Sequence, residues 1–163
     1  MSDEKNLILA KTVFNTLCEF MDHKEMNYEK DEEKLIVHFG MVGDDIPMDF
    51  LVAIDEERQL IILMSRLPFE MAEDKRMDGA IAACVANFPL LDGNFDYDLP
   101  NGKFTFRMTA SFRESLIGEE LFFYMIGYAS AAVDEYNDKF LAISKGTLSI
   151  ADFVESTYDS IKG

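Results

Sequence analysis

Residues 93–112 read GNFDYDLPNGKFTFRMTASF, and this stretch decides the fold class. Polar and apolar residues alternate around an Asn-Gly pair at 101–102, and Asn-Gly is the strongest short-range signal for a β-hairpin. Successive side chains of a strand point to opposite faces. Three polar residues therefore share one face of the first strand: Asn94, Asp96 and Asp98. The stretch predicts two antiparallel strands with one solvated face and one aromatic face.

Three more strand signals precede this hairpin, at residues 35–41, 46–54 and 59–64. The turns between them have about four residues, and links that short favour antiparallel hairpins over parallel crossovers. The segment at residues 30–34 is polar and acidic, and we expect it to be a link without regular structure.

Apolar residues at helical spacing predict four helices, over residues 3–24, 70–88, 118–143 and 147–161. The element order is then α-βββ-α-ββ-α-α. This order predicts an α+β fold with one twisted antiparallel sheet of about five strands and helices packed on it. Residues 1–163 are expected to form a single domain, with a C-terminal helical extension at about 147–162.

The chain is strongly acidic, with 31 acidic and 15 basic side chains among 163 residues and a net charge of −16. Nucleic acids are bound through Lys and Arg, so we expect no nucleic-acid partner. Anionic membrane surfaces are disfavoured for the same reason, and no stretch approaches the roughly 20 apolar residues of a membrane helix. The charge fits solubility, or the selection of partners that carry basic or amphipathic segments.

The N-terminus and the cysteines favour a cytoplasmic protein. The first residues are acidic, whereas a signal peptide begins with basic residues and continues into an apolar run. Cys18 and Cys84 lie far apart without C-x-x-C spacing, and both have apolar neighbours. We expect free thiols in a reducing compartment.

Motifs that carry chemistry are missing from the sequence. Residues 92–98 resemble the start of a calcium loop, but Tyr97 stands where that loop needs Gly, and Lys103 where it needs Glu. Neither His23 nor His38 has a second His at metal-ligand spacing. No nucleophile elbow or phosphate-binding glycine loop is present. We therefore expect no cofactor, no metal and no enzymatic activity; the alternative is a small-ligand binder or an enzyme with an unrecognised pocket between sheet and helix.

Residues 121–133 are apolar nearly all the way round the predicted helix. Such a helix needs two partners, its own sheet and another helix or subunit. The second helix is thin, because it is rich in alanine and contains Gly79. A symmetric homodimer is the commonest soluble oligomer, and we expect one here. The candidate partner or dimer surface consists of Leu121, Phe122, Phe123, Met125, Ile126 and Ala83.

The segment Gly93-Asn94-Phe95-Asp96 … Asn101-Gly102-Lys103-Phe104-Thr105-Phe106-Arg107 resembles the YbjN-type domain family. In that family, a strand of the G-x-F-x-x-D type, a short turn and an aromatic strand ending in Arg precede a long helix; Asp98 corresponds to the family's acid. The resemblance extends over about residues 5–145 and includes Ala83 to Phe88 and Asp134-Glu135-Tyr136.

This family is similar in fold to the class I type III secretion chaperones, which are small acidic α+β homodimers that bind segments of partner proteins without catalytic residues. The resemblance therefore implies a non-catalytic protein-binding module, chaperone-like or regulatory, that binds a segment of a partner protein. It supplies no catalytic position to carry over.

Overall fold

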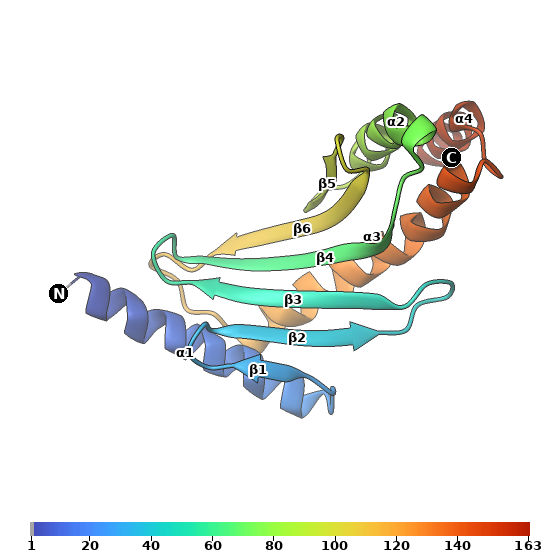
Figure 1. The fold of residues 1–163 in the computed structure, drawn as a ribbon. Coiled ribbons are helices and arrows are strands. Elements are labelled where there is room, and N and C mark those ends of the chain that lie inside the picture. Colours follow the sequence, from blue (N-terminus) through green and yellow to red (C-terminus); the bar gives the residue numbers. More distant parts are fainter. Residues whose placement is uncertain (1) are drawn as a thin grey trace.

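Six antiparallel strands form one twisted sheet in the order β1-β2-β3-β4-β6-β5 (Figure 1). The computed structural model describes residues 2–163. The strands are β1 Glu29–Asp31, β2 Ile36–Met41, β3 Met48–Asp55, β4 Leu60–Glu70, β5 Asn94–Asp98 and β6 Lys103–Ser111. The helices are α1 Ser2–His23, α2 Arg76–Asn87, which follows a 3₁₀ turn at Glu73–Lys75, α3 Glu119–Lys145 and α4 Ile150–Lys162. The α+β class and the predicted order of elements are confirmed.

The sheet has six strands where about five were expected, because β1 lies in the segment predicted to be a link. This strand has only three residues, and all three are charged. It exists because it pairs with β2, with Glu29 opposite His38 and Asp31 opposite Ile36. The Asp31 carboxylate then accepts hydrogen bonds from the backbone of Glu33 and Lys34, which closes the turn into β2.

β4 is also longer than its apolar pattern predicted and continues from Met64 to Glu70. Its pairing with β6 shifts register between Arg66 and Glu70, and Pro68 lies inside this irregular stretch. Proline cannot donate a ladder hydrogen bond and is tolerated at such bulges, so the strand passes through it.

α1 and α3 lie on the same side of the sheet and cover one of its faces (Figure 1). Strand residues facing them are buried in strict alternation, as in β3, where Met48, Phe50, Val52 and Ile54 are buried. α3 packs on this face and also against α1, where the Phe122 and Phe20 rings lie 6.5 Å apart. The second partner of the two-sided helix is therefore α1 of the same chain.

Aromatic rings hold the other half of α3 to the hairpin of β5 and β6. Phe140 stacks on Phe104 with ring centroids 4.3 Å apart, and Phe95 meets Phe140 edge-on at 5.2 Å. Phe153 of α4 completes the cluster at 6.1 Å from Phe140. α4 is thus anchored in the main core through a fully buried side chain.

α2 closes the outer edge of β5. The Asn87 side chain accepts a hydrogen bond from the Phe95 N–H at 2.7 Å and donates one to the Phe95 carbonyl at 3.0 Å. Gly79 allows the helix to approach this closely, because a Cβ there would overlap the Tyr97 hydroxyl. That hydroxyl donates to the Arg76 carbonyl at 2.8 Å, which fixes the start of the helix.

Adjacent phenylalanines on α3 give a direct test of this packing. Phe122→Ala should lower the free energy of unfolding by about 3–5 kcal/mol, since it empties a buried site between α1 and the sheet. Phe123 is 62% exposed and lies under the Lys24 ammonium, so Phe123→Ala should cost about 1 kcal/mol or less. Chemical denaturation of both variants measures the difference; equal losses would contradict the assigned orientation of α3.

Two helical glycines should respond in opposite directions to alanine. Gly79→Ala should destabilise the protein by about 1–3 kcal/mol, because the new methyl group collides with Tyr97. Gly127, in the middle of α3, has no atom within 4 Å of a Cβ, so Gly127→Ala should stabilise by about 0.5–1 kcal/mol. A melting temperature that stays level or rises in Gly79→Ala would show that the close approach of α2 and β5 is wrong.

Candidate functional site

The second face of the sheet carries no helix within residues 2–163 (Figure 1). Residues paired across antiparallel strands share a face, and the pairings place two apolar rows there. One row consists of Leu51 on β3 and Met64 on β4. The other consists of Ile36 on β2, Ala53 on β3 and Ile62 on β4. These five half-buried side chains form what we name the open-face patch. Contiguous apolar surface of this kind marks interaction sites.

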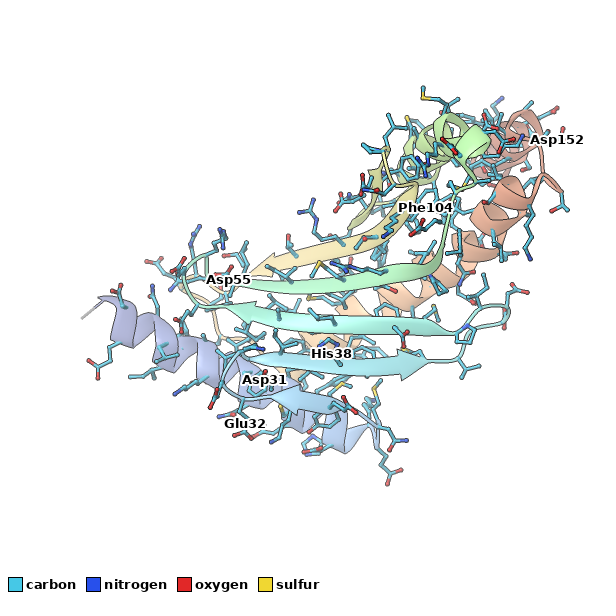
Figure 2. The ribbon with its side chains drawn as sticks, viewed as in Figure 1. Asp31, Glu32, His38, Asp55, Phe104 and Asp152 are labelled. Carbon is cyan, nitrogen blue, oxygen red and sulfur yellow. The ribbon has the colours of Figure 1, made fainter. Side chains whose placement is uncertain are left out.

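A depression lies beside the patch, with Leu51 and Met64 in its lining and three polar residues around them: His38, Asp49 and Arg66. His38 stands on β2, opposite Leu51 (Figure 2). All three polar side chains are exposed. The arrangement joins an apolar floor to groups that can donate and accept hydrogen bonds, and it is open to solvent.

Arg66 lines this depression and a second one, which runs along the irregular end of β4 past Pro68. The other cations of this face are neutralised: Arg107 pairs with Asp96 at 2.9 Å, and Lys103 with Glu70 at 3.1 Å. Among residues 2–163, no carboxylate lies within ion-pair distance of Arg66. Its guanidinium is therefore available to a carboxylate from outside the chain.

The edge of β2 is partly uncovered. β1 pairs only with Ile36 to His38, so the strand continues to Met41 without a neighbour on that side among the described residues. A third depression lies there, lined by residues that include Tyr28, His38 and Gly40. An exposed edge with free backbone groups is a template for an added strand.

The acidic side chains of the segment that resembles a calcium loop have hydrogen-bond partners within the fold. The Asn94 amide donates to Asp96 at 2.7 Å, and Asp98 accepts from the Asn101 amide in the turn. Both β5 acids thus belong to hairpin contacts. Within residues 2–163, no three His, Cys, Asp or Glu side chains converge as they would around a metal ion.

Asp31 and Asp55 begin the turns that follow β1 and β3 (Figure 2). Hydrogen bonds from the backbone N–H of Lys34 and of Arg58 lower the pKa of the two carboxyls. Both side chains stay ionised at neutral pH, as turn-capping acceptors should. A general acid would need the opposite shift.

The residues predicted as a partner or dimer surface divide between core and surface. Phe122, Met125 and Ile126 are buried beneath α1 and the sheet, and Ala83 is buried in α2. Leu121 is half-buried at the edge of the core, while Phe123 is exposed. In this conformation the four buried residues face their own chain: α1 occupies the side of α3 that the sequence left without a partner, and Ala83 lies on the side of α2 that is buried in the fold. Phe123 and Leu121 remain predicted members of a partner or dimer surface.

The open-face patch was not identified from the sequence, although a signal was present. Leu60 to Met64 is apolar at every position, whereas a strand with one solvated face alternates. The run thus indicated that both faces of β4 carry apolar side chains.

Among the described residues, no helix combines the length and hydropathy that a bilayer-spanning segment needs.

No family model and no curated protein matches this sequence. Two solved structures share its fold. YbjN from E. coli is 14% identical, with a TM-score of 0.54, and the match covers 77% of this chain and 92% of that one. A chain of the HopA1–SchA chaperone–effector complex is 16% identical, with a TM-score of 0.55 over 83% of this chain and 97% of the other. At such identities the likeness concerns the fold alone, and the predicted YbjN-type, secretion-chaperone-like fold is confirmed.

Proposed function

We propose that this chain is a non-catalytic protein-binding module, chaperone-like or regulatory, and that it binds a segment of a partner protein on the open face of its sheet. The observation that carries the proposal is the open-face patch itself, an apolar surface that no element of residues 2–163 covers. The depressions around it are open to solvent, as expected for a surface that receives a polypeptide.

The patch alone supports only weak binding. Completing the burial of a half-exposed Leu, Ile or Met side chain gives about 1 kcal/mol, so the four large side chains of the patch give about 4 kcal/mol and Ala53 adds little. The lost freedom of two associating molecules costs about 4 kcal/mol or more. A bound segment therefore needs the flanking groups as well. Arg66 offers a charge-assisted hydrogen bond, and the free edge of β2 offers main-chain pairing.

Charge supports a selective partner. With a net charge of −16, the chain attracts basic or amphipathic segments and repels nucleic acids and anionic membranes. One solved structure of this fold belongs to a chaperone–effector complex, which supports a protein as the partner. We further propose that the protein is a cytoplasmic homodimer. Two free cysteines in residues 2–163 fit the reducing compartment.

Matched leucine variants test the binding face. Leu51→Asp places a charge in the open-face patch and should reduce partner capture at least tenfold. Leu116→Asp makes the same change on a fully exposed loop side chain and should leave capture unchanged. Affinity capture from native lysate with quantitative mass spectrometry compares the two, and circular dichroism checks that both fold. Equal capture by both variants would rule out the open face as the binding surface.

Salt should separate the roles of charge and apolar contact. With the purified partner, the association rate should fall as ionic strength rises, because the acidic surface steers encounter. If apolar contacts and main-chain pairing hold the complex, the dissociation rate should change little, since ions screen neither; a dissociation rate that rises with salt would point to Arg66 instead. Kinetics on an immobilised partner across a salt series measure both rates. An association rate indifferent to salt would leave solubility as the only role of the −16 charge.

A further inference from the structure

Three alternate residues of β4 point to the open side of the sheet: Ile62, Met64 and Arg66. The side chains between them are buried on the helix-covered side. Alternate residues of a strand are about 6.6 Å apart, so two apolar side chains and a cation follow one another within about 13 Å. We name these three residues the β4 row. An extended polypeptide has the same repeat, so its alternate side chains can meet the β4 row one for one.

The pairing of β3 with β4 stops just before Arg66. The last pair on this side is Leu51 with Met64, so Asp49 and Arg66, which come next in register, are not paired. The Asp49 carboxylate lies over β2 instead, where one of its oxygens would be 3.6 Å from a Cβ added to Gly40. The acidic side chain that could have neutralised Arg66 is therefore turned toward the other neighbouring strand.

The other acids close to Arg66 are engaged within the chain. Arg66 also lines the depression at the irregular end of β4, and each of the three carboxylates of that depression has a partner: Glu70 with Lys103, Asp96 with Arg107, and Asp98 with Asn101. Among the described residues, Arg66 is thus the one arginine or lysine of the two depressions without a carboxylate partner. A chain of net charge −16 repels acidic segments, so a carboxylate is favoured beside Arg66 and disfavoured elsewhere on this face.

We infer that the open face binds an extended segment of a partner protein in which two apolar residues and one acidic residue occupy alternate positions. The inference rests on the proposed function and names the chemistry of its partner. The two apolar side chains contact Ile62 and Met64, and the acidic side chain reaches Arg66. Ala53 and Leu51 of β3 lie beside the two apolar positions. The motif is apolar-x-apolar-x-acid or its reverse, since a segment can lie along β4 in either direction.

The chemistry of the β4 row specifies where the acid stands in the motif. A guanidinium presents its N–H groups as a planar fork that matches the two oxygens of a carboxylate. A hydrogen bond of this charge-assisted kind gives about a tenfold gain in affinity. An acid placed over Ile62 or Met64 instead loses water against an apolar side chain without gaining a partner. The segment is thus held in one register, with its acid at Arg66.

Selection from a random peptide library displayed on phage tests the motif without a known partner. The wild-type protein should enrich Asp and Glu several-fold at the motif position, although its net charge disfavours acids elsewhere in the peptide. Arg66→Glu should replace this preference with Lys or Arg at the same position. Arg113→Glu makes the same change on an exposed arginine outside the depressions and should leave the preference unchanged. Acids that stay enriched in Arg66→Glu, or wild-type peptides without them, would overturn the inference.

A selected peptide then gives an affinity measurement that needs no charge reversal in the protein. Replacing the acid of the peptide with its amide should weaken binding to the wild type about tenfold, and binding to Arg66→Ala less than about twofold. Fluorescence anisotropy measures the four affinities, and circular dichroism checks that each variant folds. Equal losses in the wild type and in Arg66→Ala would show that the acid does not contact Arg66.

Leu51→Asp separates failure of the motif from failure of the proposed function. Selection that is lost in Leu51→Asp but indifferent to the acid would contradict the motif alone. Selection that is unchanged in Leu51→Asp would contradict the open face as the binding surface. Light scattering on a sizing column should give the wild type and Leu51→Asp the same mass; a lower mass for Leu51→Asp would show that a second copy covers the face, and would overturn the inference.

Discussion

The packing of α3 on two sides at once determines the rest of the molecule. Its 27 residues make a rod about 40 Å long, which lies along the sheet and also supports α1. Phe122 contacts α1 at one end, and Phe140 stacks on Phe104 of β6 toward the other. The two long helices share one side of the sheet, while α2 packs against β5, α3 and α4, so no helix of residues 2–163 covers the other side. The same packing that builds the core leaves the opposite face free to bind.

The sequence predicted those elements whose pattern is local. The alternation around Asn101-Gly102 located the hairpin, where Gly102 adopts a positive φ of 69° and its N–H donates to the Asp98 carbonyl. β1 was missed because three charged residues carry no pattern, and pairing with β2 alone makes them a strand. The extension of β4 past Pro68 was missed because it depends on a bulge against β6, which lies about 35 residues further along the chain.

The candidate surfaces were harder to predict, because exposure depends on which elements meet. Periodicity showed that α3 is apolar on two sides, but it could not distinguish a subunit from α1 as the second neighbour. Phe122 and Met125 were therefore placed at a surface that the chain itself fills. Conversely, Ile81 has the same helical spacing as a core residue and is 44% exposed, because only one side of α2 rests on β5 and α3.

The contact between Asn87 and Phe95 has a consequence for stoichiometry. One amide side chain satisfies both outward backbone groups of Phe95 and so takes the place of a neighbouring strand. A sheet with two free edges can join copy to copy without limit and grow into a fibre. Here α2 closes the β5 edge, so within residues 2–163 the sheet can be extended only at its other end, beside β1 and β2. A strand-adding partner then binds once per chain, and the assembly stays finite even where the protein is abundant.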